Sequence, residues 1–144
     1  MPWELPDDPP EYELIIANPS QFTRELKSLG PDDTSTVDVA IRNLLTVDPY
    51  DLLATDWLKK ISPELWEFRI GKTTTAVFSK IGLAPPEGFR PGKILVRVFC
   101  SFQRGRVILL LSAYDKGRDP SPKRQQREIE KARRILATWK QENH

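Results

Sequence analysis

The amino-acid sequence predicts an α+β domain: a small, mainly antiparallel sheet packed against two N-terminal helices, with one further helix at the C-terminus. Apolar residues recur with helical spacing near both ends of the chain and alternate in the segments between them. With 144 residues, 39% of them hydrophobic, the chain can bury one core. We therefore expect a proline-rich arm over residues 1–10 and a single domain over residues 11–144.

The first half begins with a strand and continues with helices. Residues 12–17 (YELIIA) are short, β-branched and bounded by Asn-Pro, which predicts a strand. Ser20 is placed to cap a helix that stops at Gly30-Pro31. Helical spacing of the apolar residues within 37–45 predicts a second helix, ending before Pro49. Residues 50–61 are compatible with a helical turn or a loop.

Residues 65–70 (LWEFRI) show the alternation of a half-buried strand. Trp66, Phe68 and Ile70 face one way, and Leu65, Glu67 and Arg69 face the other. The second face carries the charged residues Glu67 and Arg69, and the simplest interpretation is that this face is exposed to solvent. Residues 71–93 contain a threonine run and a Pro-Pro-Glu-Gly turn signal, which indicate an insertion with a short strand possible at 76–81.

A hairpin and a helix complete the domain. Strands over residues 94–100 and 107–114 flank a turn in which Gly105 can adopt positive φ. A two-residue turn at Arg104-Gly105 would place Arg97 opposite Ser112, with Tyr114 on the same face. Ser121-Pro122 then begins a helix whose apolar stripe runs to the C-terminus.

Charge is distributed unevenly along the chain. Residues 1–64 carry 13 acidic and 5 basic residues, whereas residues 65–144 carry 17 basic and 7 acidic residues. A fold that gathers the basic residues on one side would attract a polyanion, although two solvated faces of different sign are the alternative. The split also suggests that the acidic arm shields the basic face.

Several classes of function are excluded by what the sequence lacks. A single cysteine, Cys100, rules out internal disulfides and Cys-rich zinc sites, and His144 is the only histidine. No phosphate loop and no dinucleotide fingerprint is present. No secretion signal or membrane-spanning stretch appears either. We expect a cytoplasmic protein with no metal, no cofactor and no membrane partner.

The remaining chemistry is that of a phosphodiester site. Arg69 and Arg97 can fork onto phosphate oxygens and stabilise charge that builds there. Attack by a ribose 2′-OH on the adjacent phosphate also needs a proton acceptor and a proton donor. The available groups are Glu67, Tyr114, Asp115 and a lysine of lowered pKa, for which crowding by cations favours Lys116.

Basic residues after the last strand would extend this site along an RNA backbone. They are Arg118, Lys123, Arg124 and Arg127. Alternatively, these residues form only the solvent-exposed side of an amphipathic helix.

Three segments carry a family resemblance. They are residues 59–70 (KKISPELWEFRI), residues 95–99 (LVRVF) and residues 109–132 (LLLSAYDKGRDPSPKRQQREIEKA). Together they resemble the RelE/HigB-like toxins of type II toxin-antitoxin systems, closest to a phage-derived branch of the RelE/ParE family. The proline-rich arm, the 71–93 insertion and the lack of a site histidine depart from that pattern.

The resemblance implies a RelE-like fold and a ribosome-dependent mRNA endonuclease held inactive by a helix-turn-helix antitoxin. It carries functional roles onto Arg69, Arg97 and either Lys116 or Arg118; Tyr114 is added from its place beside them. An alternative within this fold is a non-catalytic binding module, either a gyrase poison or a phage-borne regulator. A third interpretation makes the basic face only a docking site for an acidic antitoxin segment.

Overall fold

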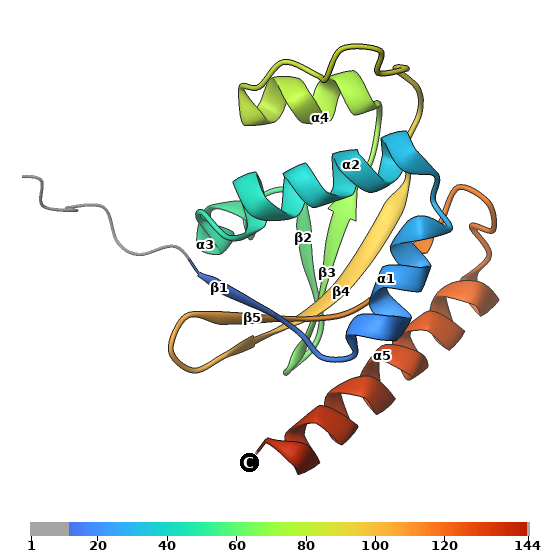
Figure 1. Cartoon of the computed structure of the whole chain (residues 1–144). Coiled ribbons are helices and arrows are strands. Elements are labelled where there is room, and N and C mark those ends of the chain that lie inside the picture. Colours follow the sequence, from blue (N-terminus) through green and yellow to red (C-terminus); the bar gives the residue numbers. More distant parts are fainter. Residues whose placement is uncertain (1–11, 144) are drawn as a thin grey trace, which may run out of the picture.

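The computed structural model describes residues 12–143 (Figure 1). Its five strands form one sheet in the order β1-β5-β4-β3-β2. The strands are β1 (Glu13–Ile16), β2 (Leu58–Ser62), β3 (Leu65–Ile70), β4 (Val96–Gln103) and β5 (Val107–Asp115). β1 runs parallel to β5 and all other neighbours are antiparallel. The predicted α+β class, with a mainly antiparallel sheet, is confirmed.

Helices precede, interrupt and follow the sheet. They are α1 (Pro19–Lys27), α2 (Pro31–Ala40) with a π-helical last turn η1 (Ile41–Leu45), α3 (Pro49–Leu52), α4 (Thr74–Ile81) and α5 (Pro122–Glu142). The predicted C-terminal helix is therefore present as α5.

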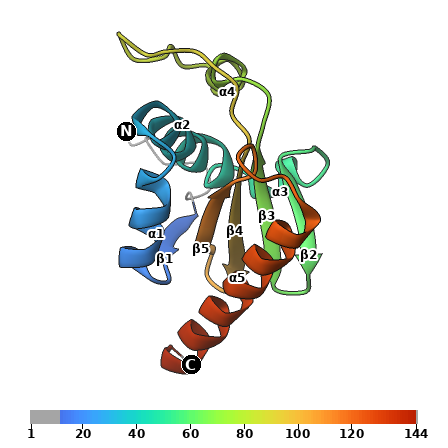
Figure 2. The same ribbon diagram turned by 90° about the vertical axis from the view of Figure 1, so that its right-hand side faces the viewer.

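Helices cover both faces of the sheet (Figures 1 and 2). Phe22 of α1 and Val37 of α2 share a buried cluster with sheet residues such as Phe68. On the opposite face, Ile129 and Leu136 of α5 pack into a second cluster with the sheet. α5 therefore covers the face of the sheet opposite to α1 and α2.

One local prediction for the first half is wrong, and one segment left open by the sequence is now assigned. The N-cap of α1 is Asn18, whose side chain accepts a hydrogen bond from the Gln21 N–H at 3.2 Å, and not Ser20, which lies inside the helix. Pro19 fits the first turn because its missing N–H has no partner to lose there. The undecided segment after Pro49 contains both α3 and the edge strand β2.

The insertion contains a helix where a strand was thought possible. Residues 74–81 form α4, capped by the Thr73 side chain and ended by Gly82 at φ 83°. Its neighbouring residues Val77 and Phe78 are both buried, which a strand with one covered face would not allow. The threonine run that indicated an insertion lies in the cap and first turn of α4.

The register of the β4–β5 hairpin differs from the prediction by one residue next to the turn and by two residues at Arg97. Gln103 pairs with Val107, and a bulge between Phe99 and Cys100 moves Arg97 opposite Tyr114 instead of Ser112. At Arg97 the shift is two residues, which keeps Arg97 and Tyr114 on the same face because side chains alternate with a period of two. Next to the turn, where the shift is one residue, Leu110 lies on the opposite face from Tyr114. Arg97 and Tyr114 therefore still share one face.

The face that carries Glu67 is covered rather than solvated. Glu67 is fully buried, and Leu65 on the same face packs in the cluster beneath α5. The prediction of a half-buried strand was therefore wrong for β3. The proposed arm, residues 1–10, and His144 lie outside the described residues. Between residues 12 and 143, no helix has the length and apolar character needed to cross a membrane.

Candidate functional site

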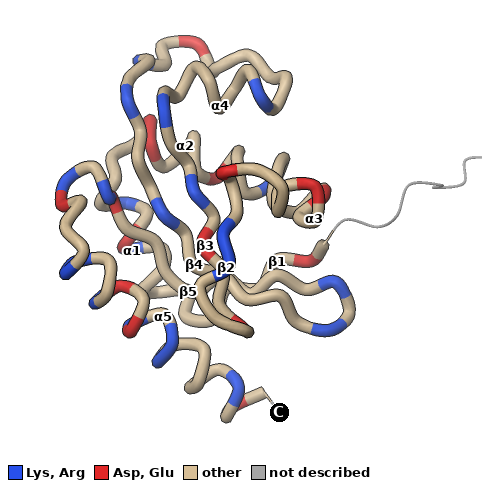
Figure 3. Tube along the Cα trace, turned by 180° about the vertical axis from the view of Figure 1, so that it is seen from behind, with Lys and Arg blue, Asp and Glu red and all other residues tan. Residues whose placement is uncertain are grey.

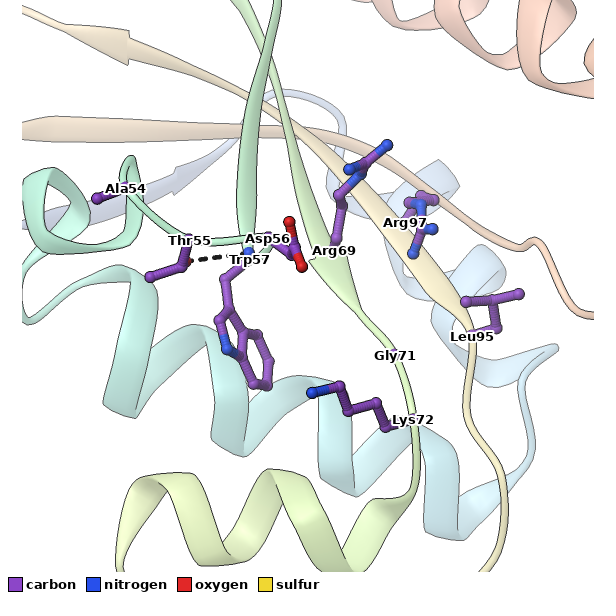
Figure 4. A pocket seen from close by; sticks show the side chains of 9 residues that line it. All are labelled: Ala54, Thr55, Asp56, Trp57, Arg69, Gly71, Lys72, Leu95 and Arg97. Atoms are coloured by element: carbon purple, nitrogen blue, oxygen red, sulfur yellow. Dashed lines mark hydrogen bonds between the residues drawn. The ribbon is translucent and has the colours of Figure 1, made fainter.

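The sheet register places three predicted site residues in one row. Arg69 of β3 lies directly opposite Arg97 of β4, and Arg97 lies directly opposite Tyr114 of β5. Figure 4 shows the two arginine side chains projecting to the same side of their strands. We call Glu67, Arg69, Arg97, Tyr114 and Lys116 the basic cluster.

Glu67 is the anion within the basic cluster. Its Oε1 lies 2.9 Å from Arg69 Nε and 3.9 Å from Arg97 Nε, while its Oε2 accepts a hydrogen bond from Gln125 of α5 at 3.3 Å. The Glu67 side chain is fully buried, whereas that of Arg69 is 26% exposed. The carboxylate thus lies deeper than both guanidinium groups, of which Arg69 is the more exposed.

Arg97 is a buried cation with unused donors. It is 8% exposed, and its Nε has no hydrogen-bond partner among the described residues. Its Nη1 makes one long contact of 3.4 Å with the carbonyl of Val96. Burial lowers the pKa of Arg97, as does Arg69, against the opposing effect of Glu67. An anionic acceptor would satisfy this guanidinium.

Tyr114 places a protonated phenol beside the two arginines. Its ring stacks on Phe99 at 6.1 Å, and the Arg124 guanidinium lies 5.2 Å from its centre. Burial, and then Glu67, raise the pKa of Tyr114 to about 12, so the hydroxyl is protonated at neutral pH. That hydroxyl is buried without a hydrogen-bond partner among residues 12–143. The Tyr114 hydroxyl is therefore a hydrogen-bond donor in a fixed position with no acceptor among the described residues.

Lys116 follows β5, and its backbone N–H donates to the Leu95 carbonyl at 2.9 Å. Burial lowers the pKa of its ammonium, and the cations Arg97, Arg69 and Lys59 lower it further, against Glu67. The deprotonated form that a general base requires is therefore more accessible in Lys116 than in an ordinary surface lysine. Lys59 of β2, which faces Glu67 across the strand pair, was not anticipated from sequence.

The four predicted RNA-binding residues do not act as one group. Arg124 adjoins the cluster through Tyr114 and pairs with Glu128 at 2.8 Å. Arg118 is paired with Asp115 at 3.4 Å. Lys123 and Arg127 are exposed on the first turns of α5. Figure 3 shows how basic positions continue from the central strands along this helix.

A pocket of about 710 Å³ opens beside the two arginines (Figure 4). Arg69 and Arg97 line it, whereas Glu67 does not. The other lining residues are Ala54, Thr55, Asp56, Trp57, Gly71, Lys72 and Leu95. The loop before β2 and Lys72 were not predicted to contribute, because neither follows a strand or helix pattern that links it to the arginines.

The comparisons leave the family open. No protein-family model matches the chain and no curated protein resembles it at a significant level. Within residues 12–143, no group of three or more His, Cys, Asp or Glu residues is arranged to hold a metal ion.

Proposed function

We propose that the chain is a toxin of the RelE/HigB type: a metal-independent endoribonuclease that cuts mRNA on the ribosome, in the cytoplasm. The observation that carries this proposal is the row of Arg69, Arg97 and Tyr114. Arg69 and Arg97 line an open pocket, and the buried, protonated phenol of Tyr114 lies next to Arg97 on the same sheet face. Such a set matches the needs of a phosphodiester whose charge grows during attack.

The reaction follows from the groups available. The 2′-oxygen of a ribose attacks the adjacent phosphorus, and the bond from phosphorus to the 5′-oxygen breaks, leaving a 2′,3′-cyclic phosphate and a 5′-hydroxyl. Lys116, in its neutral form, accepts the 2′ proton, and the Tyr114 hydroxyl donates to the leaving oxygen. Arg69 and Arg97 bind the phosphate oxygens throughout.

An antitoxin would inhibit this enzyme by covering the same groups. The basic cluster attracts an acidic segment as readily as a phosphate, since both present oxygen anions to guanidinium groups. We expect a helix-turn-helix antitoxin to supply such a segment.

Translation in vitro tests the proposal. Added protein should halt translation, and toe-printing should map a cut in the ribosome-bound message with a cyclic phosphate at its 3′ end. Arg97→Ala should lose the cut while circular dichroism shows the wild-type helix content. Intact mRNA at protein concentrations that saturate the ribosomes would contradict the proposal.

A non-catalytic binding module is the second candidate, and Glu67 favours it. Its carboxylate already lies within ion-pair distance of both arginines, which reduces the positive charge offered to a phosphate. Under this candidate the protein would bind nucleic acid or a protein partner without cutting RNA. RNA binding that Arg97→Ala abolishes, together with intact message, would favour it.

A further inference from the structure

The pocket beside the arginines has a wall that the phosphate chemistry does not use. Its size, about 710 Å³, lies within the range of pockets that hold small organic ligands. Arg69 and Arg97 occupy one side, and the opposite side is formed by the loop that carries Asp56 and Trp57, together with Lys72 after β3. A nucleotide with its phosphate on the arginines would therefore direct its base toward this wall.

Trp57 supplies a stacking surface there. Its ring packs against Phe68 of the core at 6.1 Å between centroids, which fixes its orientation. The ring remains only partly buried, and it borders the pocket. Bases splayed out of a single strand stack on aromatic rings held in this way.

Asp56 and Lys72 add hydrogen-bonding groups of opposite kind. Neither side chain makes a hydrogen bond or an ion pair with any residue in the described part of the chain. Lys72 also has φ 78°, an unfavourable conformation for a residue with a side chain, held by a hydrogen bond from the Ile94 N–H to its carbonyl at 3.2 Å. Strain of this kind concentrates at ligand sites.

We infer that this wall is a subsite for a guanine base of a single-stranded RNA. The inference rests on the proposed function for the origin of the RNA, but the pocket's chemistry is independent of cleavage. Asp56 accepts from the N1–H and N2–H₂ donors of guanine, and Lys72 donates to its O6 and N7 acceptors. Trp57 stacks on the ring.

The other bases match this wall poorly. Adenine presents the N1 lone pair to Asp56 and an amino group where Lys72 needs an acceptor. Uracil offers Asp56 one N–H flanked by two carbonyl oxygens, which the carboxylate repels. Cytosine offers Asp56 its amino group but has a lone pair at N3 and lacks the second ring that would reach Lys72. Guanine alone satisfies both side chains.

Binding of the four ribonucleoside 3′,5′-bisphosphates tests the subsite without any cleavage. These probes carry one phosphate on the 3′-oxygen and one on the 5′-oxygen of the ribose. Isotope-labelled protein should show the indole N–H signal of Trp57, assigned with Trp57→Phe, moving on addition of the guanosine compound. Its dissociation constant should be at least about tenfold lower than those of the other three, as one bidentate base contact provides.

Asp56→Asn separates base reading from phosphate binding. It should remove the preference for guanosine while affinity for the other three bisphosphates stays within about twofold. Asp51→Asn is the matched control, since Asp51 is an exposed carboxylate on α3 that does not line the pocket. It should leave the guanosine preference intact.

The outcomes for the subsite and for the nuclease are distinguishable. Preferential guanosine binding through Trp57 by a protein that leaves mRNA intact would uphold the subsite and overturn the nuclease. Cleavage with no guanosine preference in binding, or with a preference that Asp56→Asn leaves unchanged, would overturn the subsite and uphold the nuclease. Signal changes confined to residues outside the pocket would also overturn it.

Discussion

Arg97 and Tyr114 face each other directly across β4 and β5, on the side of the sheet that α5 covers. The bulge at Phe99 and Cys100 sets this pairing. Glu25 of α1 links β5 to both neighbouring helices. It accepts a hydrogen bond from the Ala113 N–H at 2.9 Å and forms an ion pair with Lys131 of α5 at 2.6 Å. Glu25 therefore fixes the positions of α1, β5 and α5 relative to one another.

This pairing is costly to fold. The Tyr114 hydroxyl and Arg97 Nε are both buried without hydrogen-bond partners among residues 12–143. An unpartnered buried polar group costs about 1–3 kcal/mol. Such a cost persists in natural proteins chiefly where function needs the group.

Tyr114→Phe should therefore lower activity without lowering stability. The change removes a hydroxyl that has no partner and keeps the ring stacked on Phe99, so the free energy of unfolding should stay the same or rise by about 1 kcal/mol. RNA cleavage should fall by about tenfold or more, because the proton donor is lost. Urea unfolding and toe-printing measure the two effects. A clear loss of stability would show that the hydroxyl has a structural partner after all.

The same residue predicts a loss of stability in alkali. Burial raises the pKa of Tyr114 to about 12, above the ordinary tyrosine pKa of about 10, so folding favours the protonated phenol. That contribution is complete below the unfolded pKa and is lost as pH rises through the folded pKa. Between about pH 9 and about pH 11, the wild type should lose about 1 kcal/mol more than Tyr114→Phe. Equal losses in paired urea titrations would contradict the raised pKa.

Glu67→Gln should be strongly destabilising. It leaves the shape unchanged but removes the charge that compensates Arg69 and Arg97, and removing one partner of a buried ion pair costs about 3–5 kcal/mol. Glu64→Gln is the matched control, because Glu64 pairs with Lys140 at 2.6 Å with both side chains about half exposed. An exposed pair contributes at most about 1 kcal/mol. Similar urea midpoints for the two variants would contradict the buried role of Glu67.

The face on which the site residues lie could be predicted from sequence, whereas their register could not. Alternation in residues 65–70 and 94–100 assigns Arg69 and Arg97 to one face, and the structure pairs the two residues directly. The predicted pairing of Arg97 with Ser112 was wrong, because Arg97 lies opposite Tyr114. The hairpin's turn contains two residues of positive φ, Gly105 and Arg106. Only Gly105 predicts this conformation from its residue type. The bulge has no signature in the sequence.

Two elements were missed for physical reasons. β2 is an edge strand in which neighbouring residues Lys59 and Lys60 are both exposed, so it lacks the alternation that identifies a strand. Basic residues on an edge strand discourage pairing with another chain, which explains their presence there. The pocket wall combines Asp56, Trp57 and Lys72 from separate loops, and only the three-dimensional fold brings these together.

Lys72→Gly should stabilise the fold while it removes a group from the pocket. At φ 78° glycine has no steric penalty, whereas a residue with a side chain costs roughly 1 kcal/mol, so the free energy of unfolding should rise by at most about 1 kcal/mol. Part of this gain is offset, because glycine gains more freedom in the unfolded chain.

Arg106→Gly, at φ 61° in the hairpin turn outside the pocket, is the matched control and should relieve similar strain. Because only Lys72 borders the pocket, only Lys72→Gly should weaken binding of guanosine 3′,5′-bisphosphate, by about tenfold. Calorimetric unfolding and bisphosphate titration of both variants check this; equal weakening in the two would assign the effect to backbone relaxation rather than to the lost ammonium group.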